Sequence, residues 1–361
     1  MAEHPVGTDG RDLLAAAGVL FTDERGRLLV VRVSYEAEHP VAVPGGGWEE
    51  QDLSPRATAV REIEEELGIT PRLGALACLD WSVDGDRPPI AAFLYWADPL
   101  TAAELRGLRL EEGELGWSGF LAPGRAAAAL PPMLSRRVAA CLRAPRSAGP
   151  LELAVGHPVG HSLEHLAPAP PVRYTGAAGL PPLAVEHPPP PPPMDRATYL
   201  ATRARIRAKA RMLFTDPDGR VLLVRLHPRP HDRRPYWVLP GGGIEADREL
   251  PRQAARREIR EELGWECEPG RLLVLDWLPG RPGSRAQLVH VFDGGTVTAE
   301  RLATARLPED EVAEARLVTP EQARELLSAP ARARVEAAVA ARRRTGGPAE
   351  LVRGAPAGEP A

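Results

Sequence analysis

The sequence predicts an α+β protein built from two copies of one domain, each a mixed β-sheet packed between helices. Two observations support this. Residues 45–81 and 241–277 align without a gap at an offset of 196, and residues 20–32 match 213–225 at an offset of 193. In each copy, apolar runs of strand length are interleaved with two helical patterns.

The proline content locates the boundary between the copies. Of the 40 prolines among 361 residues, 14 lie between residues 145 and 193, and six of these are consecutive, Pro188–Pro193. A segment of this kind favours extended polyproline II over helix or sheet. We therefore expect domains at 11–144 and 197–345, a proline-rich linker at 145–196, and a flexible tail at 346–361.

Charge and cysteine content exclude several classes of protein. The formal net charge is −4, which lacks the basic excess of a nucleic-acid binder, and Lys209 is the single lysine. Cys78, Cys141 and Cys267 are widely spaced and odd in number, so no disulfide framework is expected and a reducing compartment is favoured. Neither a basic leader with an apolar core nor a run of about 20 apolar residues is apparent. We expect a cytoplasmic protein without a membrane partner.

Each copy has the same expected order of elements. A hairpin turns at residues 23–26 or 216–219, followed by the strands 28–33 or 221–226. A glycine loop follows at 44–47 or 240–243. The next helix has a proline in its first turn and a glycine just past its end. Strands at 76–81 and 90–96, or 272–277 and 287–292, precede a terminal helix, which in the second copy begins at about Pro320 with Glu321 in its first turn.

The helix after the second glycine loop carries a group of carboxylates. Glu258, Glu261 and Glu262 are spaced i, i+3 and i+4, so they project from one face and repel one another. Hard divalent cations such as Mg²⁺ relieve that repulsion, because they take oxygen ligands. A solvated acidic face is the ordinary alternative. The triple glycine at fixed spacing before the helix, present in both copies, favours a metal site.

These residues resemble the signature of the Nudix hydrolase family. That signature is Gly, five residues, Glu, seven residues, Arg-Glu, an aliphatic residue, any residue, Glu-Glu, any residue, Gly and a bulky apolar residue. The second copy matches at nine positions within 23 residues: Gly243, Glu249, Arg257, Glu258, Ile259, Glu261, Glu262, Gly264 and Trp265. The resemblance covers the loop and helix, and it implies an α/β/α sandwich with a mixed sheet in each of two tandem domains.

The resemblance also implies an activity and a cofactor. Members of the family hydrolyse a diphosphate bond, usually in a nucleoside diphosphate linked to another group. By resemblance, Glu258, Glu261 and Glu262 would hold Mg²⁺ or Mn²⁺ with help from the Gly243 carbonyl. Arg257 would pair with Glu249 and orient Glu258.

The general base is less well defined by the motif. In the family it is a motif glutamate or a glutamate on a later loop, and here Glu309 and Glu311 are candidates, with Glu112 and Glu114 in the first copy. A polar loop without catalytic function explains these residues equally well. Trp237, just before the glycines, could stack a base, although core packing is the commoner role of such an aromatic residue.

The first copy departs from the signature at one position. Leu53 stands where the motif has its first glutamate, although the three expected metal ligands Glu62, Glu65 and Glu66 are all present. The neighbouring Asp52 is shorter and one residue out of register. We expect Arg61 to lose its partner and Glu62 to be less firmly oriented. The first domain is therefore expected to be degenerate, binding a ligand or packing against the second copy, although turnover there stays open.

Two other functions remain open. A nucleotide-binding regulator would bind without turnover, but no DNA-binding pattern accompanies the fold. Isopentenyl diphosphate isomerase shares the fold but needs a cysteine before the motif, and all three cysteines follow a motif. The expected partner is a small nucleotide diphosphate, with selectivity from the loops 34–40 and 227–236. The two copies could form an intramolecular pseudo-dimer, or the chain a homodimer.

Overall fold

The computed structural model describes residues 10–34, 39–83, 88–146, 149–164, 166, 172–181, 202–228 and 236–357. The chain divides into two compact units. The first domain is Leu14–Arg205, and the second domain is Ile206–Ala361 together with the N-terminal residues up to Leu13. The proline run Pro188–Pro193 and much of both expected selectivity loops lie outside the described residues.

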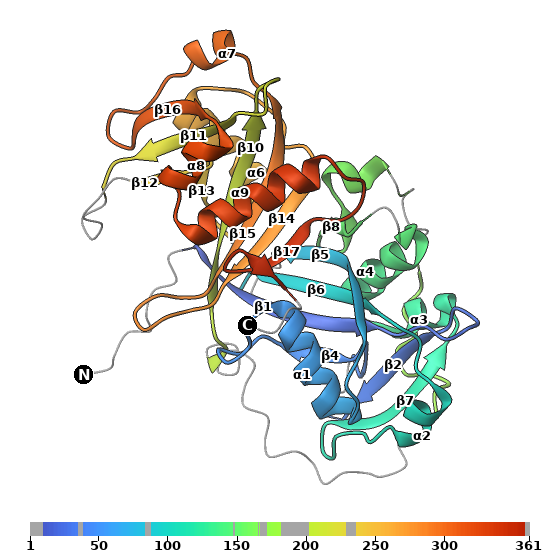
Figure 1. Cartoon of the computed structure of the whole chain (residues 1–361). Helices are drawn as coiled ribbons and strands as arrows, with labels where there is room; N and C mark the ends of the chain where they lie inside the picture. Colours follow the sequence, from blue (N-terminus) through green and yellow to red (C-terminus); the bar gives the residue numbers. More distant parts are fainter. Residues whose placement is uncertain are drawn as a thin grey trace, which may run out of the picture. The chain divides into compact units, whose positions relative to one another are not determined.

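The elements of the first domain follow the predicted order (Figure 1). Its strands are β1 (Asp12–Leu20, of which the first two residues are grouped with the second domain), β2 (Leu28–Val33), β3 (Val41–Ala42), β4 (Gly45–Gly47), β5 (Leu73–Ser82), β6 (Ile90–Ala97), β7 (Leu115–Leu121), β8 (Leu151–Ala154) and β9 (His157–Pro158). Its helices are α1 (Pro55–Leu67), α2 (Ala102–Gly107), α3 (Pro123–Ala129), α4 (Pro132–Arg143) and the short 3-10 helix η2 (Gly160–Glu164).

The second domain repeats that order. Its strands are β10 (Ile206–Thr215), β11 (Val221–Leu226), β12 (Tyr236–Val238), β13 (Gly241–Gly243), β14 (Leu272–Leu278), β15 (Gln287–Thr296), β16 (Val312–Val318), β17 (Ala349–Val352) and β18 (Ala355–Pro356). Its helices are α6 (Pro251–Leu263), α7 (Ala299–Ala303), α8 (Pro320–Leu326) and α9 (Ala329–Arg342).

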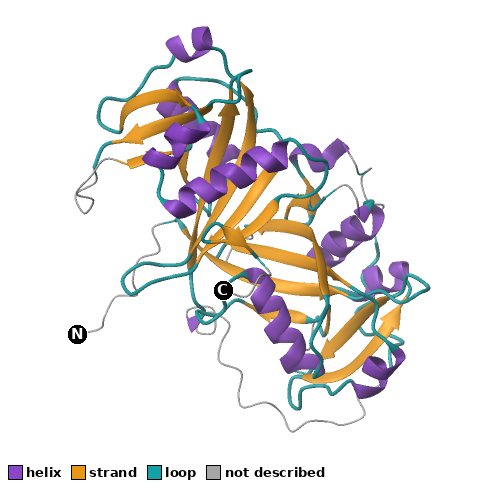
Figure 2. Ribbon diagram, viewed as in Figure 1, coloured by secondary structure: helices purple, strands orange, loops and turns teal. Residues whose placement is uncertain are grey.

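Each domain contains a mixed sheet of the predicted kind (Figure 2). In the second domain the strand order is β13-β10-β15-β14-β17-β18, with β10 parallel to β15 and β14 antiparallel to it. The first domain has the same arrangement, β4-β1-β6-β5-β8-β9. A smaller group, β12-β11-β16 or β3-β2-β7, completes each domain. The predicted mixed α+β fold, present twice, is confirmed.

Local sequence signals define the motif helices. Helix α6 has Pro251 in its first turn, and α1 has Pro55 there. Both helices end at a left-handed glycine: Gly264 has φ = 71° and Gly68 has φ = 66°. Glycine adopts this conformation without a Cβ penalty, so it is suited to stopping a helix.

The terminal helix differs from the expectation. The segment beginning at Pro320 forms two helices, α8 and α9, separated at Leu327 and Ser328. Pro330 lies in the first turn of α9. A proline inside a continuous helix would remove a hydrogen bond and clash with the preceding turn, so the chain starts a new helix there. Helix α9 then packs across β14 and β10 (Figure 1).

The expected linker and tail also contain ordered structure. Strand β8 pairs in parallel with β5, and β17 pairs in parallel with β14, so a short hairpin extends each main sheet. The expectation of an extended linker starting at residue 145 is therefore wrong for β8 and β9, and a flexible tail is wrong for β17 and β18. Four-residue strands beside glycine and proline carry too little periodicity to be recognised locally.

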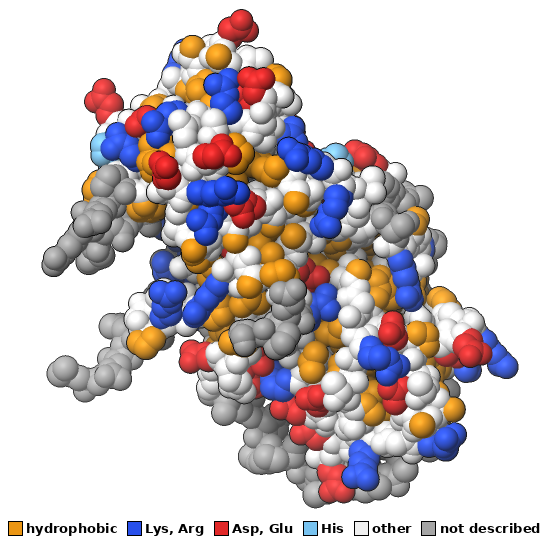
Figure 3. Space-filling model, viewed as in Figure 1, with side chains coloured by type: hydrophobic (Ala, Val, Ile, Leu, Met, Phe, Trp, Pro, Cys, Tyr) orange, Lys and Arg blue, Asp and Glu red, His pale blue; other side chains and the backbone are white. Residues whose placement is uncertain are grey.

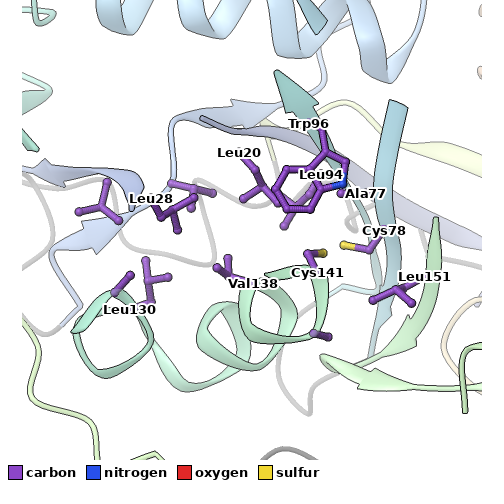
Figure 4. Packing of buried hydrophobic residues seen from close by; sticks show 14 of the residues in the cluster. Leu20, Leu28, Ala77, Cys78, Leu94, Trp96, Leu130, Val138, Cys141 and Leu151 are labelled. Atoms are coloured by element: carbon purple, nitrogen blue, oxygen red, sulfur yellow. The ribbon is translucent and has the colours of Figure 1, made fainter. Parts of the chain in front are cut away.

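The core of the first domain lies between helix α4 and strands β5 and β6 (Figure 4). Val138 and Cys141 of α4 face Cys78 of β5 and Trp96 of β6. The sulfur atoms of Cys78 and Cys141 point toward each other, but neither forms a disulfide, and Cys267 is also free. The expectation of no disulfide framework is confirmed for the three cysteines.

A buried ion pair connects the sheet, the last long helix and the final hairpin of the second domain. Asp276 of β14 is fully buried and accepts hydrogen bonds from Arg334 Nε at 2.7 Å and from the Gly354 amide at 3.1 Å. The first domain repeats this arrangement with Asp80, Arg137 and Gly156. The pair explains how a four-residue strand is held on each sheet edge.

The surface carries both signs of charge. On the face shown in Figure 3, basic and acidic side chains are interspersed within each domain. Within the part of the chain that the structure describes, every helix is too short or too polar to cross a lipid bilayer.

Candidate active site

The glycine loop of the second domain lies directly against the carboxylates of helix α6. The Gly241 amide donates a hydrogen bond to Glu262 Oε2 at 2.6 Å. A Cβ at Gly242 would lie 2.3 Å from Glu258 Oε2, and one at Gly241 would lie 2.2 Å from the Ala210 carbonyl oxygen. Because no side chain fits in these gaps, the glycines allow strand β13 to approach both β10 and the carboxylates.

Arg257 organises the carboxylates around it. Its Nε and Nη2 donate to the two oxygens of Glu249 at 3.1 and 2.7 Å, the predicted pairing. Its Nη1 donates to Glu258 Oε1 and Glu261 Oε2, each at 2.9 Å. Nη2 also donates to the Gly243 carbonyl at 2.9 Å. One guanidinium therefore restricts the rotamers of three glutamates and ties the helix to the glycine loop.

Burial makes the ionised carboxylates costly. Glu262 is 1% exposed and Glu258 is 8% exposed. Burial raises the pKa of Glu262 to about 8, although Arg211 and the Gly241 amide act against this shift. Burial also raises the pKa of Glu258, against the opposing effect of Arg257. Two carboxyl groups that ionise with difficulty side by side form a site that a divalent cation would stabilise.

These carboxylates face a cavity of about 120 Å³. Its lining includes Glu258, Glu262, the glycines of β13 and Glu311. Glu311 therefore lies at the site, whereas the other candidate base, Glu309, is exposed and does not line the cavity. Glu261 is half-exposed beside Arg257 and is also absent from the lining. The structure thus brings Glu258, Glu262 and Glu311 together.

The donor set suits Mg²⁺ or Mn²⁺ completed by a substrate. No group of three or more His, Cys, Asp or Glu side chains among the described residues forms a complete metal-binding cluster. Magnesium, however, is usually held by one or two carboxylates together with substrate phosphates and water. Glu258 and Glu262 supply two hard oxygen donors at the cavity wall, and Gly243 also lines the cavity. These groups fit the implied cation.

Trp237 does not line the cavity. It packs against the core cluster of the second domain, and the Arg316 guanidinium lies 4.8 Å from the centre of its ring. Of the two expected roles of Trp237, these contacts support the commoner one, core packing.

The corresponding site of the first domain differs from the expectation. Arg61 keeps an acidic partner: its Nε and Nη2 each donate to Asp52 at 3.0 Å. Asp52 is buried and also accepts from the Thr58 hydroxyl at 2.9 Å, whereas Leu53 is 55% exposed. The expected loss of the Arg61 partner is therefore wrong. The loop turns Leu53 outward and brings the shorter Asp52 to the position of the motif glutamate.

The remaining contacts of the first site match those of the second. The Gly45 amide donates to Glu66 at 2.7 Å, and Arg61 contacts Glu62 at 3.0 Å, Glu65 at 2.7 Å and the Gly47 carbonyl at 3.0 Å. Burial raises the pKa of Glu62 to about 7 and that of Glu66 to about 8. Glu114, the counterpart of Glu311, adds to both shifts. The first site therefore retains the arrangement expected to attract a cation.

Removal of the Asp52 carboxylate should weaken that site. In Asp52→Ala, Arg61 loses its bidentate partner, and we expect the Mn²⁺ affinity of the first domain to fall by about 10–100-fold. Titration with Mn²⁺ by calorimetry in a Glu262→Gln background measures the Mn²⁺ affinity of the first domain, because the second site has lost a ligand. Leu53→Ala is the matched control, since this side chain is exposed. Equal Mn²⁺ affinities for Asp52→Ala and Leu53→Ala would show that Asp52 has no supporting role.

Two features escaped the sequence analysis. Arg211 of β10 lines the second site. The signal in the sequence was that Arg211 aligns with Gly18 at the repeat offset of 193, and the strand registers agree with that alignment. The Asp276–Arg334 pair was also missed, although Asp80 and Asp276 occupy equivalent positions of the repeat.

Comparisons with known proteins agree with this geometry. The NUDIX domain family model matches residues 12–129 and 205–339. A CTP pyrophosphohydrolase of Escherichia coli K12 is 42% identical over 57 residues, which are 16% of this chain and 41% of that protein. Diphosphoinositol polyphosphate phosphohydrolase 2 of Rattus norvegicus is 36% identical over 81 residues, 22% of this chain and 42% of that protein. The chain thus spans less than half the length of these relatives.

Solved structures also resemble parts of the chain. A MutT protein from Methanosarcina mazei Go1 is 24% identical with a TM-score of 0.32, over 38% of this chain and 94% of that one. The Escherichia coli ORF135 protein is 26% identical with a TM-score of 0.31, over 38% of this chain and 91% of that one.

Proposed function

The chain belongs to the Nudix hydrolase family through two tandem Nudix domains, and on that premise we propose that it is a Mg²⁺- or Mn²⁺-dependent hydrolase. Its substrate is a nucleoside diphosphate derivative, cleaved at the diphosphate bond mainly by the second domain. The observation that carries this proposal is the pair of buried carboxylates, Glu258 and Glu262, that faces one cavity beside the glycine loop. Free thiols are in keeping with action in the cytoplasm.

The residues divide the chemical work among them. Glu258, Glu262 and the Gly243 carbonyl would hold the cation, which would neutralise phosphate charge and lower the pKa of the attacking water. Arg257, held by Glu249, keeps Glu258 oriented. Glu261 also accepts a hydrogen bond from Arg257 and so helps to hold the guanidinium in place. Glu311 accepts a proton from the water as its oxygen bonds to phosphorus. The bridging P–O bond breaks, and the electron pair leaves with the second phosphate.

The organic part of the substrate has a place beside this site. A second cavity of about 90 Å³ is lined by Arg211, which also lines the catalytic cavity. Its lining is mainly apolar residues of the sheet and of α9, such as Val289 and Val335. The other lining residues are Tyr236 and the cationic residues Lys209, Arg211 and Arg334. An apolar pocket with a few polar groups suits a ring or another organic group.

A substrate panel tests the proposal. The full chain is incubated with nucleoside triphosphates, nucleotide sugars, ADP-ribose, NADH and dinucleoside polyphosphates, in Mg²⁺, Mn²⁺ or EDTA, and the products are separated by ion-exchange chromatography. CTP and a diphosphoinositol polyphosphate are included because the two relatives are named for them. We expect metal-dependent cleavage of at least one diphosphate. Tight nucleotide binding without turnover at any metal concentration would instead indicate a regulator.

The raised carboxyl pKa values predict a pH dependence. Because the pKa of Glu262 in the folded protein lies near 8, above its ordinary value, this group favours the metal-free fold at low pH and loses that contribution as pH rises through about 8. Metal binding requires the ionised form and therefore competes with the proton. We expect the Mn²⁺ affinity to be at least about 10-fold higher at pH 8 than at pH 6.

Calorimetry in buffers of different ionisation enthalpy measures both the affinity and the protons released. The metal-free protein should unfold at a lower temperature at pH 8 than at pH 6, and Mn²⁺ should raise that temperature more at pH 8. An affinity that is the same at both pH values, without proton release, would contradict the assignment of Glu262 as a ligand.

A further inference from the structure

One cation of the second site has no role in the proposed mechanism so far. Arg211 lies on β10 and is 8% exposed. Its Nη1 donates to the carbonyl oxygens of Leu239, at 3.0 Å, and Gly241. Glu258 and Glu262 act on it electrostatically, yet no ion pair among the described residues joins Arg211 to either carboxylate. The guanidinium therefore sits close to the carboxylates without being neutralised by direct contact.

Such a position is costly. Burial lowers the pKa of Arg211, so the protein stabilises the charged form less well than water does. A buried charge without a paired counter-ion is rare in proteins unless it has a binding partner at some stage of function. The two carbonyl contacts use one terminal nitrogen, and a guanidinium carries five N–H donors in a planar fork.

The first domain shows that the fold does not require this arginine. Gly18 pairs with Gly45 in the first domain, in the same register in which Arg211 pairs with Gly241 in the second. The glycine loop, the amide contact to Glu66 and the contacts of Arg61 are all formed in the first domain with Gly18 at the position of Arg211. A different cation, the Arg203 guanidinium, lies against Gly47 there. Support of the glycine loop is therefore an insufficient explanation for Arg211.

Its location suggests what it binds. Arg211 lines both the catalytic cavity and the second, mainly apolar cavity, so its side chain is accessible from both. A diphosphate whose reacting phosphate lies at Glu258 and Glu262 must carry its other phosphate away from these carboxylates and toward its organic group. A planar guanidinium is well matched to the oxygens of a phosphate.

We propose that Arg211 is a substrate-binding residue of the second domain, whose guanidinium binds the phosphate on the far side of the scissile bond. This inference rests on the proposed function and adds to it a difference between the domains: the first domain, with Gly18, lacks this phosphate contact and binds diphosphates more weakly.

Binding without turnover tests the proposal. The probe is imidodiphosphate, a non-hydrolysable analogue of the diphosphate group, titrated with Mn²⁺ into the full chain by calorimetry. All variants carry Glu66→Gln, which removes a ligand of the first site, so the measured metal binding comes from the second domain. We expect Arg211→Gln to weaken imidodiphosphate binding about 10-fold or more, and Arg211→Lys to recover part of the affinity, since one bidentate contact is worth roughly 1–3 kcal/mol. Arg248→Gln, a change of an exposed arginine between β13 and α6, should have no effect.

Titration with Mn²⁺ alone separates phosphate binding from structural support. Removal of a positive charge beside two carboxylates should leave Mn²⁺ binding unchanged or tighter in Arg211→Gln. Parallel loss of Mn²⁺ and imidodiphosphate binding would mean that Arg211 only supports the glycine loop, and the proposal would be wrong. Unchanged imidodiphosphate affinity would also overturn it, even if the panel demonstrates hydrolysis.

A structure of the wild-type chain provides the second measurement, which does not depend on the folding of any variant. With Mn²⁺ and imidodiphosphate bound, a phosphate oxygen should lie within hydrogen-bond distance of the Arg211 guanidinium. A diphosphate held at Glu258 and Glu262 without this contact would refute the proposal. If the chain hydrolyses nothing in the panel yet binds imidodiphosphate through Arg211, the hydrolase proposal fails and the phosphate site stands.

Discussion

Glu262→Gln should abolish metal-dependent diphosphate hydrolysis while leaving the fold intact. A metal contact of this kind contributes several kcal/mol to the transition state. Since about 1.4 kcal/mol corresponds to a factor of ten in rate, we expect kcat to fall about 1,000-fold. The amide oxygen of glutamine can still accept the Gly241 hydrogen bond, so the loop should stay in place. The change also removes a buried ionisable group, and the metal-free variant should unfold at the same temperature as the wild type or higher.

Glu66→Gln is the matched control, because Glu66 has the same contact with Gly45 in the first domain. We expect this variant to retain at least half of the activity, as the second domain has the complete signature and Arg211. Activities are measured under saturating Mg²⁺ with the best substrate of the panel. Full activity in Glu262→Gln with loss in Glu66→Gln would place the active site in the first domain instead.

Asp276→Asn should cause the largest loss of stability. This fully buried carboxylate accepts from Arg334 Nε and Nη2, both at 2.7 Å, and from the Gly354 amide. Asparagine has nearly the same shape but leaves the Arg334 cation without its counter-charge. Removal of one partner of a buried ion pair costs about 3–5 kcal/mol, and we expect the free energy of unfolding of the second domain to fall by about 3 kcal/mol.

Denaturant unfolding of the full chain measures this effect. Asp80→Asn should cause a comparable loss in the first domain, because Asp80 contacts Arg137 and Gly156 in the same way. Asp218→Asn is the control: its pair with Arg220 spans 3.5 Å, its side chain is 78% exposed, and exposed pairs contribute roughly 0–1 kcal/mol. If Asp276→Asn lowers the free energy of unfolding by no more than Asp218→Asn does, the Asp276 pair does not stabilise the fold.

Local patterns were sufficient to predict the elements that carry the site. The prolines and glycines at the two ends of α1 and α6 set those helices to within a residue or two, because caps act through neighbouring backbone groups. The strands 28–33 and 221–226 were also predicted with their observed bounds. The spacing of Glu258, Glu261 and Glu262 predicted three carboxylates on one face of the helix. In the structure Arg257 contacts Glu258 and Glu261, whereas Glu258 and Glu262 line the cavity.

Other features depended on residues distant in the sequence. The hairpin of β8 and β9 is held by pairing with β5 and by Asp80, which lies 76 residues before Gly156. The division of the terminal helix into α8 and α9 was the exception, because Pro330 was visible in the sequence and its effect was overlooked.

The sequence by itself determined the repeat, the fold class and the carboxylate helix on which the functional proposal rests. Only the tertiary structure decided that Asp52 replaces the missing motif glutamate, that Glu311 rather than Glu309 reaches the cavity, and that the second site contains a buried cation. The physical reason is that periodicity and capping are short-range properties of the chain. The partner of a charged side chain, by contrast, is set by strand register and loop path, which bring Arg211 beside a carboxylate 51 residues away.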